Sequence, residues 1–274
     1  MGKTGMLGFV VFRISVGMKW ACTFRGKRID KADPTEIVEF ARRRLRFEPD
    51  EKQVEILRAD SKRVLLACSR QWGKSTVAGV KAIHRAWTQR GSLTLIASPG
   101  KRQSAEFLRK TGELMSRMGL RPKGDGDNEL SILFPNGSRI VGLPGVHATV
   151  RGFSAVSLIM IDEAGLVKDE MYRALRPMLA TTAGDVWLMS TPVGKRGFFY
   201  EAWAYGGDTW TRLAVKGPEC ERIDRKFLEE ELVEHGAESF RQEYLCEFVD
   251  DGEGLFDRDV VERAVRGKVE TLEL

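Results

Sequence analysis

Short apolar runs alternate with stretches of helical character along most of this 274-residue chain. Four of these runs predict buried strands, at residues 63–69, 93–98, 157–162 and 185–190. Two intervening stretches predict helices, at residues 75–90 and about 104–118. The inward positions of the first helix are expected to be Val77, Val80, Ile83 and Trp87. Strands that alternate with helices predict an α/β fold with a mostly parallel central sheet flanked by helices.

The segments before and after this core have their own signals. A capping residue, a proline and a reciprocal glutamate in residues 33–36 predict a helix start, followed by apolar positions at Ile37, Ala41 and Leu45. A second short helix follows Pro49 and carries Gln53. Toward the C-terminus, the pattern predicts one more strand near residues 211–217, a charged helix from Asp224 to Gly236, and a last helix with Phe240 and Tyr244.

A hairpin is expected where Pro135-Asn136-Gly137 separates two short apolar segments, since this triplet favours a tight turn.

Charge and cysteine content narrow the possible partners only slightly. The chain has 44 Lys and Arg against 39 Asp and Glu, a net charge of +5 that permits a polyanionic partner without requiring one. A run of arginines on the first predicted helix is typical of a solvated face, with nucleic-acid binding as the alternative: Arg42, Arg43, Arg44 and Arg46. Four scattered cysteines argue against a disulfide framework or a zinc site and favour a reducing compartment. The apolar residues 6–18 are too short to span a membrane and contain Arg13, so no membrane partner is expected. A signal peptide is the alternative for this segment, although no cleavage site of small residues follows it.

The stretch CSRQWGKST, residues 68–76, resembles a phosphate-binding loop whose first glycine is replaced by Cys68. It lies between a predicted strand and a predicted helix, where backbone N–H groups converge on phosphates. Lys74 would reach the outer phosphates and the hydroxyl of Ser75 would hold magnesium. The other expected nucleotide-binding residues of the loop are Ser69, Arg70, Gln71, Trp72, Gly73 and Thr76. The alternative is an ordinary turn that happens to end in Gly-Lys-Ser.

Two adjacent carboxylates, Asp162 and Glu163, end the apolar run at residues 157–162. A parallel strand presents such residues at the carboxyl edge of the sheet, where ligands bind. Asp162 is expected to hold magnesium and Glu163 to polarise the attacking water, the alternative being a solvated strand end. Together with the loop, this pair predicts an ATP site. Two arginines could stabilise the transition state, Arg70 within the loop and Arg151 just before the acidic strand.

Six stretches in this order carry a family resemblance: FEPDEKQ, CSRQWGKST, IASPGKRQSAE, VRGFSAVSLIMIDEAG, LMSTPVG and FRQEYLCEFVDDGEGLF. They resemble the ATPase domain of the large terminase subunit of tailed phages, and they extend from about residue 47 to 256. The resemblance implies a P-loop NTPase fold of the additional-strand, catalytic-glutamate type with a small C-terminal lid subdomain.

The same resemblance implies roles for further residues. Gln53 matches a glutamine that reads adenine, and Ser190 and Thr191 match a motif that couples hydrolysis to DNA movement. Arg151 matches an arginine finger that some members donate to a neighbouring subunit. The implied domains are an unplaced extension (1–32), the ATPase core (33–211), the lid (212–249) and a linker (250–274) toward an absent nuclease domain, so we expect no DNA cleavage by this chain.

The implied function is an ATP-hydrolysing, Mg²⁺-dependent motor that moves double-stranded DNA into a procapsid. The implied partners are a homo-oligomeric ring of the same chain, a small terminase subunit and a portal protein, all in the host cytoplasm. Two alternatives stay open at this point: a helicase-like ATPase half-domain, and a non-hydrolysing DNA-binding or assembly protein of the same fold.

Overall fold

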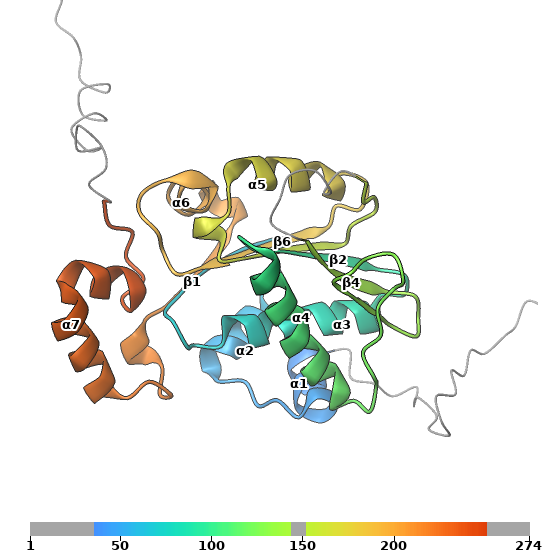
Figure 1. Cartoon of the computed structure of the whole chain (residues 1–274), viewed down its shortest axis with the longest axis horizontal. Coiled ribbons are helices and arrows are strands. Elements are labelled where there is room, and N and C mark those ends of the chain that lie inside the picture. The colour runs from blue at the N-terminus through green and yellow to red at the C-terminus, as the bar shows by residue number, and fades with distance from the viewer. Residues whose placement is uncertain (1–35, 144–151, 251–274) are drawn as a thin grey trace, which may run out of the picture. The chain divides into compact units, whose positions relative to one another are not determined.

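A computed structural model describes residues 36–143 and 152–250 of the chain. Its centre is a seven-stranded sheet in the order β3-β4-β2-β5-β6-β1-β7 (Figure 1). The strands are β1 (Arg63–Cys68), β2 (Leu93–Ala97), β3 (Ser131–Leu133), β4 (Arg139–Leu143), β5 (Leu158–Asp162), β6 (Asp185–Ser190) and β7 (Thr211–Val215). All neighbouring strands are parallel except β3 and β4, which pair antiparallel. The mostly parallel sheet and the hairpin at residues 135–137 are therefore confirmed.

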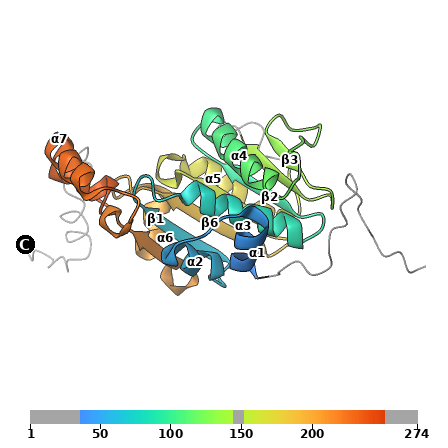
Figure 2. The ribbon, with the colours of Figure 1, turned by 90° about the horizontal axis from the view of Figure 1, so that it is seen from below.

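Helices cover both faces of this sheet. They are α1 (Ile37–Leu45), α2 (Glu51–Arg58), α3 (Lys74–Thr88), α4 (Lys101–Ser116), α5 (Asp169–Leu175), α6 (Gly197–Tyr205) and α7 (Arg225–Glu243). In Figures 1 and 2, α1 to α4 lie on one face and α5 and α6 on the other. None of the helices in residues 36–143 and 152–250 combines the length and the apolar composition needed to cross a membrane.

The two faces have separate cores because successive side chains of a strand point to opposite sides. In β1, Leu66 and Cys68 pack toward α1 to α4, whereas Leu65 and Ala67 pack toward α5 and α6. All four side chains are fully buried. A strand buried on both faces is apolar throughout, which is why the sequence pattern revealed it.

Some helices differ from the expectation. The first helix begins at Ile37, with Glu36 as its N-cap, and the residues 33–35 expected to start it lie outside the described residues. In α3, Val77, Val80 and Ile83 are buried as predicted, and Trp87 is partly buried. The helices α5 and α6 were not predicted, because α5 has only seven residues and α6 (GFFYEAWAY) is apolar on most sides.

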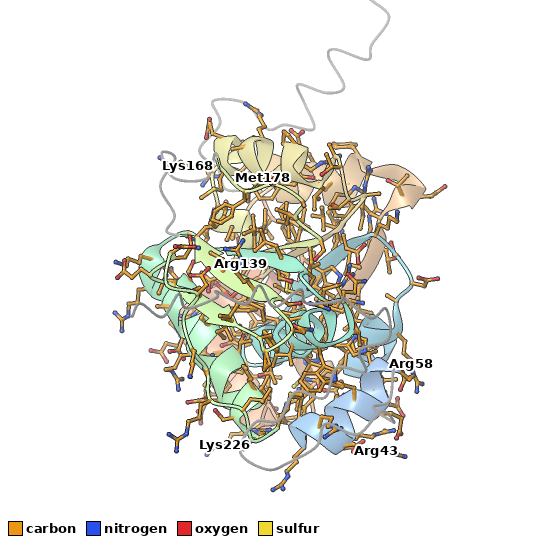
Figure 3. All side chains as sticks on the ribbon, turned by 90° about the vertical axis from the view of Figure 1, so that its right-hand side faces the viewer. Arg43, Arg58, Arg139, Lys168, Met178 and Lys226 are labelled. Carbon is orange, nitrogen blue, oxygen red and sulfur yellow. The ribbon has the colours of Figure 1, made fainter. Side chains whose placement is uncertain are left out.

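The arginine-rich end of α1 has the expected solvated character. Arg43 pairs with Glu39 of the same helix at 3.0 Å, and Arg58 of α2 pairs with Glu36 at 3.0 Å. Figure 3 shows both arginines on the outer side of their helices. Arg43, a member of the run, thus has a carboxylate partner within its own helix, as is common on a solvated helix face.

The C-terminal segment contains a break where the sequence predicts one. Gly236 has a backbone φ of 78° inside α7, a left-handed conformation that glycine adopts without steric cost. The break divides α7 into a charged first part and a short last part that ends at Glu243, with Tyr244 as its C-cap. The two predicted C-terminal helices are thus the two parts of α7.

Candidate active site

Three parallel strands end side by side at the edge of the sheet where the site lies. β5, β6 and β1 are neighbours, so Asp162, Ser190 and Cys68 at their carboxyl ends share one edge. The loop 69–73 continues from β1 directly into α3. Parallel sheets bind ligands at this edge, and a helix N-terminus there offers unbonded N–H groups.

Buried anchors and two left-handed residues shape the loop. The side chain of Trp72 is 1% exposed and packs into the core beneath α3. The N–H of Ser69 donates to the carbonyl of Val215 at 2.9 Å, so this amide is occupied within the protein. Gln71 (φ 64°) and Gly73 (φ 100°) have positive φ, which turns the chain into the first turn of α3. The loop therefore has a defined backbone conformation, which is fixed by a buried side chain, a hydrogen bond to β7 and two residues with positive φ.

Cys68 does not occupy a strained position. It is the last residue of β1, pairs with Val215 of β7, and has no positive φ. The loss of the first glycine therefore causes no strain at Cys68, and the left-handed backbone falls on Gln71 instead. Burial raises the pKa of the Cys68 thiol well above its usual range, which argues against a nucleophilic role.

A cavity of about 660 Å³ opens over the loop and gathers most of the predicted site. Its walls contain nine of the predicted residues: Arg70, Gln71, Gly73, Lys74, Ser75, Thr76, Glu163, Ser190 and Thr191. Residues from the loop, the acidic strand and the end of β6 therefore meet at one place.

The two carboxylates have different environments. Asp162 is 7% exposed, and its Oδ2 accepts a hydrogen bond from the Ser75 hydroxyl at 3.5 Å. Burial raises the pKa of Asp162, while the nearby Lys74 charge opposes this shift. Glu163 lines the cavity, and its backbone φ is 52°. One carboxylate is thus placed behind the Ser75 hydroxyl and the other faces the cavity.

Ser75 and Asp162 together suit a magnesium ion. A hydroxyl and a carboxylate are hard oxygen donors of the kind that Mg²⁺ prefers, and they come from the two elements that flank the cavity.

Gln53, the predicted adenine reader, is buried beneath the loop. Its Oε1 accepts from the Asp50 N–H at 3.1 Å, which forms a capping box on α2. Its Nε2 donates to the Trp72 carbonyl at 3.2 Å. Both polar atoms are therefore bonded within the protein, and adenine recognition by Gln53 stays a prediction.

The two candidate arginines differ in what is described. Arg70 lines the cavity and pairs with Glu243 at the end of α7, its Nε lying 2.7 Å from Oε2. Arg151 lies outside the described residues, so its role as a finger stays a prediction.

Ser190 and Thr191 lie where β6 ends, beside the acidic pair. The Ser190 hydroxyl accepts a hydrogen bond from the Gly165 N–H at 3.1 Å, two residues after Glu163. The proposed coupling motif is thus bonded to the segment that carries the candidate catalytic glutamate, although the coupling itself stays a prediction.

Five lining residues were not predicted: Lys110, Leu166, Val193, Gln242 and Glu243. Lys110 comes from the third turn of α4, and its charge also acts on the pKa of Asp162, which it lowers. Gln242 and Glu243 come from the end of α7, far from the loop in sequence. A lysine inside a predicted helix carries no motif, and only the packing of α4 beside α3 brings it to the cavity.

Comparisons with known proteins show which family this chain resembles. A family model described as the N-terminal part of T4-like-virus-type terminase large subunits matches residues 65–263. The large terminase subunits of Thermus phage G20c and Thermus virus P23-45 are each 25% identical over 249 residues, which cover 77% of this chain and 51% of theirs. The chain therefore spans about half the length of the curated relatives it matches.

Solved structures share the fold. The ATPase domain of the Thermus phage P74-26 large terminase has a TM-score of 0.68 and 22% identity, covering 77% of this chain and 98% of that domain. A large terminase from a thermophilic bacteriophage, solved in complex with ADP, has a TM-score of 0.64 and 14% identity, covering 76% and 56%. The family model matches most of the chain, so this chain belongs to the terminase large subunit family and contains sequence of the N-terminal part of that subunit.

Proposed function

We propose that this chain is the ATP-hydrolysing motor domain of a phage DNA-packaging terminase. The observation that carries the proposal is the cavity that joins Lys74, Ser75 and Glu163. A lysine at a helix N-terminus, a hydroxyl beside a buried carboxylate and a second carboxylate facing the cavity are the groups that nucleotide hydrolysis needs. The large terminase solved in complex with ADP adds support, because it has nucleotide bound on this fold.

The roles of the side chains follow from their positions. Lys74 and the amides of residues 70–75 would bind the phosphates. Glu163 would orient a water molecule and accept its proton as the water oxygen attacks the γ-phosphorus. The bond to the β–γ bridging oxygen then breaks, which leaves ADP and inorganic phosphate. Ser75 and Asp162 would hold Mg²⁺, which when bound neutralises charge on the phosphates.

Two further cations would stabilise the charge that develops on the transferred phosphoryl group. Lys110 projects into the cavity from α4, and Arg70 from the loop itself. Arg151 would act on the nucleotide of a neighbouring subunit in a homo-oligomeric ring. If so, the hydrolysis rate per subunit rises with protein concentration in the wild type and not in Arg151→Ala.

Family membership supports the wider role. A terminase motor moves double-stranded DNA, together with a small terminase subunit and a portal protein, in the host cytoplasm. The DNA contacts would be made with phosphates and would weaken steeply with salt, because a moving motor cannot depend on sequence. The family match favours this function over a helicase-like half-domain.

The alternative of a non-hydrolysing protein is tested by Glu163→Gln. We expect hydrolysis to fall by roughly 10²- to 10⁴-fold while ATP binding is retained, since the amide cannot accept the proton. Phosphate release and fluorescent-nucleotide binding measure the two quantities. Glu170→Gln is the matched control, because Glu170 is exposed on α5 and does not line the cavity. An unchanged rate in Glu163→Gln would remove Glu163 from the mechanism, and a wild type that binds ATP without hydrolysing it would favour the alternative.

A further inference from the structure

The hydroxyl of Ser98 is a buried polar group at the carboxyl edge of the sheet. Ser98 directly follows β2 and is 0% exposed, and its Oγ has no hydrogen-bond partner among the residues that the structure describes. We propose that Ser98 is a positioning residue for a divalent cation: its hydroxyl accepts a hydrogen bond from a water molecule that the cation retains, next to Asp162. This inference rests on the proposed function, because it extends the same cation site.

The register of the sheet places Ser98 beside Asp162. β2 and β5 are parallel neighbours, and the last residues that pair between them are Ala97 and Ile161. One residue further along each segment are Ser98 and Asp162. The two are therefore neighbours across strands that lie about 5 Å apart.

Both side chains point toward α3. Successive side chains alternate between the two faces of the sheet, and Ile96 and Met160 pack in the core on the side of α1 to α4. Two residues later, the same alternation directs Ser98 and Asp162 to that side. The hydrogen bond from Ser75 of α3 to Asp162 agrees with this direction.

The Asp162 carboxylate can accept further hydrogen bonds. Its Oδ1 accepts from the Glu163 N–H at 3.2 Å, and its Oδ2 accepts from the Ser75 hydroxyl at 3.5 Å, which is long for a hydrogen bond. A carboxylate can accept about four hydrogen bonds. Two neighbouring buried groups, this carboxylate and the Ser98 hydroxyl, therefore have hydrogen-bonding capacity that the described part of the chain does not fill.

A hydrated cation would supply the partner that both groups lack. Mg²⁺ usually keeps several of its water molecules when it binds to a protein. The cation polarises these waters, so each becomes a strong hydrogen-bond donor that needs an acceptor. The Ser98 oxygen is such an acceptor, and a buried hydroxyl that stays unbonded is unfavourable. Ser98 would thus add to the hold that Ser75 and Asp162 have on the cation.

Thr94 of β2 provides a matched control. It is also 0% exposed, and its Oγ1 also has no partner within the described residues. By the alternation of β2 it lies on the same face as Ser98, four residues and about 13 Å earlier along the strand. Its neighbour there is Leu158, at the start of β5, whose side chain offers no ligand for a cation. The two hydroxyls therefore differ mainly in their distance from Asp162.

The test measures the affinity for a fluorescent ADP with Mg²⁺ and with EDTA, and the ratio of the two affinities is the magnesium gain. We expect Ser98→Ala to lower the magnesium gain about 3- to 10-fold, the size of one hydrogen bond, and to leave ADP affinity in EDTA unchanged. Thr94→Val should change neither quantity. Ser98→Thr retains the hydroxyl and should keep most of the magnesium gain.

Thermal unfolding without ligand separates this role from a structural one. Ser98→Ala removes a hydroxyl that lacks a partner until the cation binds, so the unfolding temperature should stay the same or rise. A hydroxyl that stabilises the fold gives the opposite result, a lower unfolding temperature with an unchanged magnesium gain, and that result overturns the proposal. Failure of both Ser98 variants to fold overturns it as well.

The remaining outcomes distinguish this inference from the proposed function. If the wild type shows a magnesium gain and Ser98→Ala shows the same gain, only the present inference fails. If Thr94→Val lowers the gain as much as Ser98→Ala does, the effect is not specific to the position beside Asp162, and the inference fails again. If ADP binding by the wild type does not depend on Mg²⁺, the cation site of the proposed function fails together with the inference.

Discussion

The two ends of α3 place positive charge at opposite edges of the sheet, with opposite results. At its C-terminal end, Arg85 donates to Asp185 and to the Ser157 carbonyl, and the side chains of the ion pair are only 15% and 16% exposed. At its N-terminal end, Lys74 lines an open cavity. The first cation is enclosed by partners from β6 and the start of β5, whereas the second faces a space that a ligand can fill.

The helix dipole sharpens this contrast. A cation in the last turn is favoured by the dipole, and one at the first residue is disfavoured, each by about 0.3–1 kcal/mol. Arg85 therefore suits its place in the folded chain without a ligand. Lys74 has the carboxylate of Asp162 nearby, and an anion bound at the helix N-terminus would further offset the opposing dipole. In α3, the lysine whose charge opposes the helix dipole lines the candidate ligand site. The arginine whose charge agrees with the dipole forms an ion pair within the folded protein.

The largest effect should come from breaking the enclosed pair. Arg85→Ala leaves the mostly buried Asp185 carboxylate without its cation, and we expect the free energy of unfolding to fall by about 3 kcal/mol. Urea unfolding followed by circular dichroism measures this. Arg43→Ala is the control, because its pair with Glu39 is exposed and should contribute about 0.5 kcal/mol or less. Unchanged stability in Arg85→Ala would mean that the amino edge of the sheet does not depend on this pair.

A second ion pair, between Asp125 and Arg139, predicts that the free energy of unfolding depends on pH. Burial alone would raise the pKa of Asp125, but hydrogen bonds from Asn128, Ser131 and the Asp127 N–H outweigh it and lower the pKa to about 2. Arg139, at the start of β4, lies 3.3 Å from the same carboxylate. Because the folded-state pKa is below the unfolded value of 3.8, the stabilisation is present above about pH 4 and is lost as the pH falls toward 2.

Asp125→Asn should therefore lower the free energy of unfolding at pH 7 by about 2 kcal/mol and flatten its dependence between pH 4 and pH 2. Denaturant unfolding at several pH values checks both. Asp127→Asn is the control, since its side chain is exposed. A variant that keeps the wild-type slope would show that another group causes the acid sensitivity.

The smallest effect is expected on ligand binding at the carboxyl edge of the sheet, where the cavity lies. Lys110→Ala should weaken ATP binding by about 3- to 10-fold, because its ammonium group lines the cavity, while stability changes little since its pair with Glu106 is exposed and 3.8 Å long. Lys101→Ala, which removes an exposed α4 lysine paired with Glu129, should leave ATP binding unchanged. If Lys110→Ala lowered the free energy of unfolding and left ATP affinity unchanged, Lys110 would have a structural role, as Arg85 does.

The sequence predicts those parts of this molecule that follow from local pattern. The interior positions of buried strands such as 63–68 and 185–190 are apolar, and the loop and the acidic pair have fixed spacing, so both could be identified before the structure was known. Lys110 and Glu243 could not, because their place in the cavity depends on how α4 and α7 pack and not on their neighbours in sequence. The two buried hydrogen bonds of the Gln53 side chain could not be predicted from the sequence either. They join the cap of α2 to the Trp72 carbonyl of the loop, a contact that depends on how α2 packs against the loop.

Two cavity residues, Gln71 and Glu163, have a left-handed backbone that non-glycine residues adopt at a penalty of about 1 kcal/mol each. Selection of random variants for heat resistance alone should therefore enrich glycine at both positions. Under the proposed function, selection for DNA packaging should keep the original side chain at position 163, because glycine cannot supply the carboxylate. Variants recovered from the two selections would then differ at position 163, and that difference would test the proposed role of Glu163 without an assay of the purified protein.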